Sequence, residues 1–213
     1  AANIDQVFVV FALEPFCDFL LIDQYLAICE NRNITALLVY NKSDLPLSDT
    51  IEKELTNYQN LGYPLLRVSA TNNQGIEELR SSLGNKISIF SGQSGVGKSS
   101  LTNSLLPEKE LKTNTVSATT KHGRHTTTAA TLYHLPTGGD LIDSPGVAIF
   151  GLAGISENQL AHGFREFQAY IDLCQFNDCK HDKDKGCAVR KALEAGKITT
   201  PRYQRFLKLR EKM

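Results

Sequence analysis

A glycine-rich segment at residues 92–99 carries the clearest chemical signal in the sequence. It matches the pattern G-x-x-x-x-G-K-[ST] at every fixed position, and its residues are Gly92, Gln93, Ser94, Gly95, Val96, Gly97, Lys98 and Ser99. Glycines let backbone N–H groups surround a phosphate, and the helix predicted after them adds partial positive charge. Lys98 would reach the β- and γ-phosphates, and the Ser99 hydroxyl would bind Mg²⁺. We predict a nucleoside triphosphate site that includes Ser100; the alternative is a glycine turn that matches by chance.

A second polar segment predicts which base is bound. Residues 41–44 are Asn41, Lys42, Ser43 and Asp44. They resemble the N-K-x-D guanine-recognition motif of GTPases. The Asp44 carboxylate can accept from guanine N1–H and the exocyclic amine, and a site with such an acceptor rejects the wrong base by about 10⁴-fold. Lys42 can lay its stem over the base. Ser69 and Ala70, at the end of the next apolar segment, resemble the companion element whose backbone N–H contacts the guanine oxygen.

A D-x-x-G sequence follows the short apolar segment 141–142. In this motif the aspartate, here Asp143, holds Mg²⁺ through water, and the N–H of the glycine, here Gly146, meets the γ-phosphate. The alternative is an ordinary turn, because Asp, Pro and Gly are all turn formers. Together with the phosphate loop, the motif favours the nucleotide site.

The order of these motifs along the chain is itself informative. An ordinary GTPase runs from the phosphate loop through D-x-x-G and N-K-x-D to Ser-Ala. Here residues 41–44 and 69–70 come first, and residues 92–99 and 143–146 follow. Each motif keeps its own strand, so the same sheet can form with its termini moved. We predict a circularly permuted P-loop domain.

Hydrolysis requires a group that positions water, and Val147 stands where Ras-like enzymes carry a glutamine. The nearest ionisable candidates lie in the polar run 123–128. His125 could orient the attacking water, and a threonine in this run, which we take as Thr127 although Thr126 and Thr128 remain open, is the natural second Mg²⁺ ligand. The alternative is a solvated loop.

Four potential metal ligands occur within fourteen residues near the C-terminus. They are Cys174, Cys179, His181 and Cys187. Four soft ligands without an open position describe a closed structural Zn²⁺ site. Free cysteines are also common as buried apolar residues, but polar residues surround this cluster. Cys17 and Cys29 lie in an apolar helical pattern, so we predict that they are buried core residues.

Alternating apolar and amphipathic segments would position the motifs. The expected strands are residues 7–13, 36–40, 65–69, 87–90 and 141–142, and the expected helices are residues 16–31, 49–61, 75–83 and 98–106. Such alternation predicts an α/β domain with a doubly wound, mostly parallel sheet. Residues 129–135 and the strand after Gly138-Gly139 predict one antiparallel hairpin at the sheet edge. Helical patterns then surround the cysteines, so we expect a GTPase domain at residues 1–152 and a small helical zinc-binding domain at 153–213.

The composition is that of an ordinary globular protein. The chain of 213 residues holds 23 Lys+Arg and 23 Asp+Glu, and no apolar run approaches the roughly 20 residues of a membrane span. No secretory signal precedes the cysteines, so we expect a reducing, cytoplasmic location and no membrane partner. The neutral total conceals a net charge of +6 over residues 174–213, a candidate footprint for a phosphate backbone; solvated helix faces are the alternative.

The permuted order, the run Gly123-Arg124-His125-Thr126-Thr127-Thr128, the D-x-x-G motif and the cysteine cluster together resemble the RsgA/YjeQ family. These are bacterial GTPases of small-ribosomal-subunit maturation. The resemblance implies low intrinsic GTPase activity stimulated by the small subunit, His125 as catalytic residue, and zinc on the four cluster residues. It also implies an N-terminal OB-fold that this chain lacks. Because the chain opens with Ala1, we expect a fragment.

The leading hypothesis is a GTPase that binds GTP or GDP with Mg²⁺, carries one structural Zn²⁺ and acts on the small (30S) ribosomal subunit and its rRNA as a monomer. The alternative is an RNA- or ribosome-binding assembly module in which the nucleotide is only a structural or sensing ligand.

Overall fold

The computed structural model describes residues 3–106, 131–143, 151–152 and 154–213. These residues form two compact units that interleave along the sequence. One unit spans Ala1–Cys17 and Ala36–Val147, and the other spans Asp18–Thr35 and Ala148–Met213. The second unit therefore includes a segment from within the predicted N-terminal domain, while the boundary predicted after residue 152 stays a prediction.

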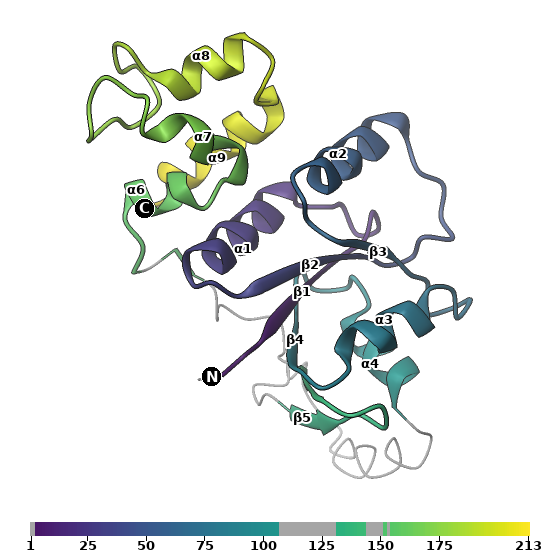
Figure 1. Ribbon diagram of the computed structural model, residues 1–213. Helices are drawn as coiled ribbons and strands as arrows, with labels where there is room; N and C mark the ends of the chain where they lie inside the picture. Colours follow the sequence, from purple (N-terminus) through teal and green to yellow (C-terminus); the bar gives the residue numbers. More distant parts are fainter. Residues whose placement is uncertain (1–2, 107–130, 144–150, 153) are drawn as a thin grey trace, which may run out of the picture. The chain divides into compact units, whose positions relative to one another are not determined.

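The first unit is built on a six-stranded sheet with the order β3-β2-β1-β4-β6-β5 (Figure 1). The strands are β1 (Gln6–Phe11), β2 (Thr35–Tyr40), β3 (Leu65–Arg67), β4 (Ile87–Ser91), β5 (Thr131–His134) and β6 (Asp140–Asp143). The pairs β1–β4, β2–β3 and β4–β6 are parallel, and β5 runs antiparallel to β6 at the edge. Buried, mostly apolar strands are typical of a parallel sheet, so the predicted fold class and edge hairpin are confirmed.

The described residues of this unit also form three helices, namely α2 (Asp49–Asn60), α3 (Ile76–Leu83) and α4 (Lys98–Leu105). The apolar faces of α3 and α4 join the strands in one core cluster, where Leu79 of α3 and Leu101 of α4 pack with Phe8, Val39 and Phe90. The core fixes the strand ends, and the predicted site residues follow those ends.

The second unit consists of helices around a separate aromatic core. They are α1 (Phe19–Asn31), α6 (Glu157–His162), α7 (Arg165–Ile171), α8 (Ala188–Glu194) and α9 (Thr200–Arg210). α1 packs against α6 and α9, and in the centre the rings of Phe164 and Phe167 stack while Phe206 meets both of them edge to face. Gly163 makes the close approach possible, because a Cβ there would lie 2.7 Å from the carbonyl oxygen of Ala27.

The start of α1 and the position of Cys17 differ from the sequence predictions. α1 begins at Phe19 rather than at residue 16, because Asp18 caps it by accepting from the N–H of Leu20. Cys17 is buried as predicted but precedes the helix, whereas Cys29 lies within it. Within the described residues, no helix is long and apolar enough to cross a membrane.

Candidate functional site

The phosphate loop connects β4 to α4 through three glycines with positive φ. Gly92, Gly95 and Gly97 have φ values of +139°, +80° and +93°. A Cβ at Gly92 would lie only 1.9 Å from the carbonyl oxygen of Val10. α4 then begins at Lys98, so its free N–H groups face the end of the loop. The loop has the backbone geometry that an anion at a helix N-terminus requires.

Lys98 is held over this loop. Its ammonium group donates to the carbonyl oxygens of Gly92 and Gln93, both at 2.8 Å. Burial lowers the pKa of Lys98, and the nearby Asp143 carboxylate opposes that shift. Burial raises the pKa of Asp143, and the positive charge of Lys98 opposes that increase. The parallel pairing of β4 and β6 sets Asp143 opposite Phe90, and this explains why the carboxylate reaches the phosphate loop.

Asn41 joins the guanine motif to the phosphate loop. Its side chain is buried, its amide nitrogen donates to the carbonyl oxygen of Val96 at 2.8 Å, and its amide oxygen accepts from the N–H of Ala70 at 3.4 Å. Gly97 allows this arrangement, because a Cβ there would lie 2.3 Å from the Asn41 amide nitrogen. Three segments that are distant in sequence therefore meet at one side chain.

The remaining residues of the guanine motif lie beside this junction. Lys42 has a φ of +61°, and its ammonium group donates to the carbonyl oxygens of Glu14 at 2.5 Å and Gly95 at 3.3 Å. Asp44 is exposed. Ser69 is buried, and its hydroxyl accepts from the N–H of Asn72.

The loop between β1 and α1 is a part of the site that the sequence analysis missed. Glu14 contacts Lys42 through its carbonyl oxygen, and Pro15 lies against the phosphate loop, 3.4 Å from a Cβ built on Gly95. The available signal was the position of Glu14-Pro15 shortly after a buried strand, at the sheet edge where the other motifs begin.

The structure thus gathers residues of all four motifs on one unit, while part of the predicted site is not described. Asn41, Lys42, Ala70, the phosphate loop and Asp143 are connected as above. His125, Thr127 and Gly146 lie outside the described residues, so their roles stay predictions.

The cysteine cluster lies in the second unit. The ligand atoms of Cys174, Cys179, His181 and Cys187 all lie within 4.8 Å of one another. Nδ1 of His181 is 3.6 Å from the sulfur of Cys174 and 3.6 Å from that of Cys187. Four donors so arranged around one point can hold a metal ion.

Hydrogen bonds connect the cluster to its surroundings. The N–H groups of Ala188 and Arg190 each point at a cysteine sulfur at 3.4 Å, and Tyr203 donates to the carbonyl oxygen of His181 at 2.6 Å. Burial raises the pKa of Cys179 to about 12 and lowers the pKa of His181. The lowered pKa favours the neutral imidazole, which is the form that binds a metal ion, and a metal ion bound here would have to displace the proton of the Cys179 thiol.

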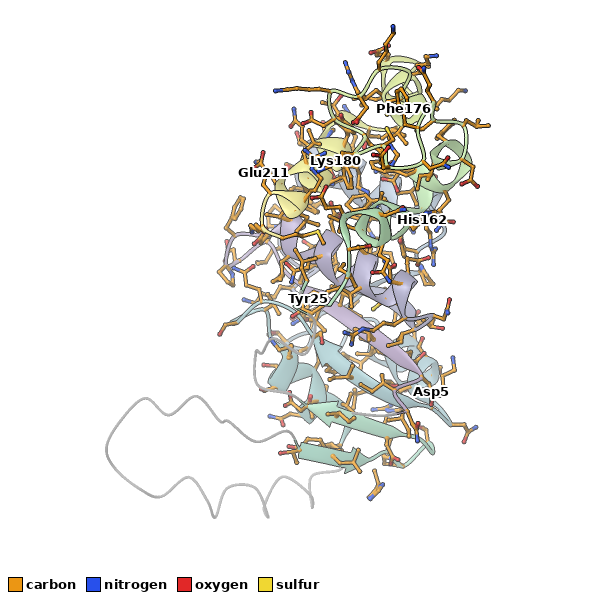
Figure 2. The ribbon with its side chains drawn as sticks, turned by 90° about the vertical axis from the view of Figure 1, so that its left-hand side faces the viewer. Asp5, Tyr25, His162, Phe176, Lys180 and Glu211 are labelled. Atoms are coloured by element: carbon orange, nitrogen blue, oxygen red, sulfur yellow. The ribbon has the colours of Figure 1, made fainter. Side chains whose placement is uncertain are left out.

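Part of the positive charge of the basic C-terminal segment is neutralised by ion pairs within the protein. Arg202 and Arg205 pair with Asp23 and Glu166, which are acids from outside that segment. Seven lysines of the segment remain exposed, and Lys180 is labelled in Figure 2; they are Lys180, Lys183, Lys185, Lys191, Lys197, Lys208 and Lys212. The candidate footprint is therefore a lysine surface and excludes these two arginines.

Comparisons with known proteins agree with the permuted fold. The RsgA GTPase family model matches residues 1–153. The small ribosomal subunit biogenesis GTPase RsgA of Klebsiella pneumoniae (strain 342) is 48% identical over 218 residues, and the match covers the whole of this chain and 62% of that relative. The chain thus spans less than two thirds of that relative's length.

Two solved structures are similar to almost the whole chain. YjeQ from Thermotoga maritima has a TM-score of 0.81 at 36% identity, with 99% of this chain and 71% of that one covered. YloQ, described as a circularly permuted GTPase, has a TM-score of 0.78 at 28% identity, with 99% and 68% covered. The predicted resemblance and the permuted fold class are confirmed.

Proposed function

We propose that this chain, which belongs to the RsgA GTPase family, binds GTP and hydrolyses it to GDP and phosphate. The observation that carries the proposal is the Asn41 side chain, which links the guanine motif to the phosphate loop through Val96 and to the Ser-Ala element through Ala70. A nucleotide that occupies both motifs requires them to lie next to each other, and the Asn41 contacts hold them so.

Each part of the site has a role in this reaction. Backbone N–H groups of residues 92–97 and the start of α4 bind the phosphates, and Lys98 exchanges its contacts with Gly92 and Gln93 for phosphate oxygens. Ser99, Asp143 and Thr127 would hold Mg²⁺, which neutralises charge developing on the β- and γ-phosphate oxygens. His125 orients water for in-line attack, and the Gly146 N–H contacts the γ-phosphate.

The cysteine cluster holds one structural Zn²⁺ in this proposal. Three thiolates and one imidazole fit zinc better than a hard cation such as Mg²⁺, and no ligand position is left open for catalysis. The zinc would stabilise the segment between α7 and α8, where the apolar side chains of Leu173 and Phe176 are exposed.

The small ribosomal subunit is the proposed partner. The relative from Klebsiella carries that partner in its name, and the exposed lysines of this chain offer contacts for an RNA backbone. We place the protein in the cytoplasm as a monomer whose slow turnover is stimulated by the subunit.

Base selectivity tests the proposed nucleotide directly. Asp44→Asn replaces a double acceptor with an amide, which suits xanthine rather than guanine. We expect the variant to lose GDP affinity by about 10²-fold or more and to gain affinity for XDP. Wild-type protein that binds ADP and GDP equally in competition would contradict the assignment.

A further inference from the structure

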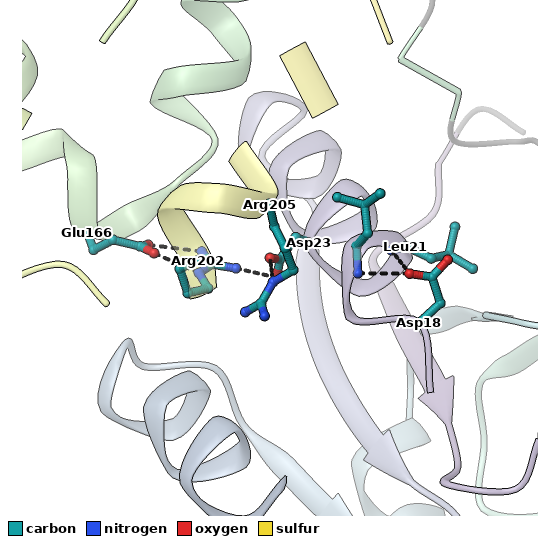
Figure 3. A network of polar contacts seen from close by, with 7 residues as sticks. Asp18, Leu21, Asp23, Glu166, Arg202 and Arg205 are labelled. Carbon is teal, nitrogen blue, oxygen red and sulfur yellow. Dashed lines mark hydrogen bonds and ion pairs between the residues drawn. The ribbon is translucent and has the colours of Figure 1, made fainter. Parts of the chain in front are cut away.

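A buried ion network ties α1 to the C-terminal helices of the second unit (Figure 3). The Arg202 guanidinium donates to both carboxylate oxygens of Glu166, at 2.6 and 2.9 Å, and to one oxygen of Asp23 at 2.5 Å. Arg205 donates to the other oxygen of Asp23 at 2.5 Å. The Asp23 and Arg202 side chains are 0% and 1% exposed, so each charge depends on its partners for stabilisation.

Further contacts hold α1 in the same unit. The Asn31 amide donates to the carbonyl oxygen of Gln159 at 2.8 Å, and Arg165 donates to the Glu30 carboxylate at 2.9 Å. Arg202 also stacks over the ring of Phe164, 4.6 Å from its centroid. The position of α1 is therefore set by residues far away in the sequence.

The C-terminal end of α1 continues almost directly into the strand that carries the guanine motif. Asn33 has a φ of +52° and donates to Glu30, and Ile34 donates to Cys29 at 3.0 Å. This bonding pattern is a Schellman motif, which fixes the direction of the chain as it leaves a helix. β2 starts one residue after Ile34 and ends immediately before Asn41.

The N-terminal end of α1 follows the loop that touches the same motif. Asp18, the N-cap, lies four residues after Glu14, whose carbonyl oxygen accepts from Lys42. Both chain connections of α1 thus lead to the guanine motif, one through the contact between Glu14 and Lys42 and the other through β2.

We infer that Asp23 and Arg202 are positioning residues for guanine-nucleotide binding, acting through α1. The inference rests on the proposed function and deepens it: contacts within the unit that carries the cysteine cluster change the affinity of the other unit for the nucleotide. Because such coupling is reciprocal, the nucleotide also stabilises the helices that hold α1.

Substitutions in the network test the coupling. Asp23→Asn and Arg202→Met should each raise the Kd for GDP by about fivefold or more, the lower edge of typical coupling between sites. Arg205→Gln removes the contact of Arg205 with Asp23 and leaves that of Arg202, so it should give a smaller increase while the protein stays folded. Glu52→Gln, which breaks the exposed pair with Arg67 in the first unit, is the control and should leave the Kd unchanged. Metal content and circular dichroism of each variant report folding separately.

Hydrogen exchange of the wild-type chain tests the same inference without substitution. Saturation with GDP should slow amide exchange in α9 and α1. GDP binding that leaves α9 exchange unchanged, or Asp23→Asn protein that binds GDP as tightly as wild type, would overturn the coupling alone. Wild-type protein that binds no GDP would instead contradict the proposed function, and the coupling with it.

Discussion

At the scale of single residues, the site depends on glycines that make room for other side chains. Gly97 is the clearest case, because it combines a φ of +93° with an Asn41 amide nitrogen only 2.3 Å from where a Cβ would stand. Gly154 has nearly the same φ, +94°, and nothing within 4 Å of its Cβ position. An alanine at either position strains the backbone to a similar extent, but only an alanine at Gly97 collides with a side chain of the site. A comparison of the two substitutions therefore separates the two effects.

Gly97→Ala should weaken GDP binding by about tenfold or more, which corresponds to about 1.4 kcal/mol. The added methyl group displaces Asn41 from the carbonyl oxygen of Val96 and so separates the two motifs. Gly154→Ala is the matched control and should keep wild-type affinity in the same titration. Equal affinities for the two variants would show that the Asn41 contact is irrelevant to binding.

His125→Ala should slow single-turnover GTP hydrolysis by about 10²-fold or more, in the range that a positioned acid–base group contributes. The Kd for GTP should stay within about twofold, since a group that orients water makes its main contact in the transition state. An unchanged hydrolysis rate would exclude His125 from catalysis.

At the scale of elements, the close packing of α1 against the junction of α6 and α7 rests on Gly163. Its φ is ordinary, but a Cβ would lie 2.7 Å from the Ala27 carbonyl oxygen and 2.8 Å from the Ala27 Cα. Backbone atoms cannot yield cheaply, so an added methyl group must push the helices apart.

Gly163→Ala should lower the free energy of unfolding of the second unit by about 1–3 kcal/mol. Gly84→Ala is the control, because Gly84 also has a negative φ and its Cβ would meet only the Ser81 carbonyl oxygen at 3.6 Å. Urea unfolding is followed through the C-terminal helices for Gly163→Ala and through the sheet of the first unit for Gly84→Ala. If the two variants were equally stable, α1 would not pack as described.

Local patterns predicted most of the elements, but they carry no information on which distant elements pack together. The predicted strand at residues 87–90 is observed as Ile87–Ser91, and the predicted helix at 98–106 as Lys98–Leu105, because apolar periodicity and glycine signals are properties of neighbouring residues. The placement of α1 with the C-terminal helices was not predictable, since Asp23 and Arg202 are separated by 179 positions and neither stands in a motif. The same holds for Glu14, which contributes only a backbone oxygen to the site.

At the scale of the whole molecule, metal binding and folding of the second unit are expected to be one event. The four ligands lie between α7 and α8 and at the start of α8, where Cys187 caps the helix through the N–H of Arg190. Without a metal, three thiols and an imidazole would be left with only weak mutual contacts.

Cys187→Ser, or chelation of the wild-type protein, should abolish binding of one equivalent of zinc and lower the melting temperature of the second unit. The hydroxyl can still cap α8, so Cys187→Ser separates loss of the metal from loss of the cap. The measurements are the zinc content by mass spectrometry and the melting temperature of the same samples. Full stability after complete metal removal would contradict a structural role.

The most direct measurement for the account is GTP turnover by the purified chain, alone and with small ribosomal subunits. We predict slow hydrolysis of GTP but not ATP by the chain alone, and faster GTP hydrolysis when subunits are added to a chain extended to the full length of its relatives. GTP that is bound but never hydrolysed under either condition would contradict a GTPase and favour an assembly module in which the nucleotide is only a ligand.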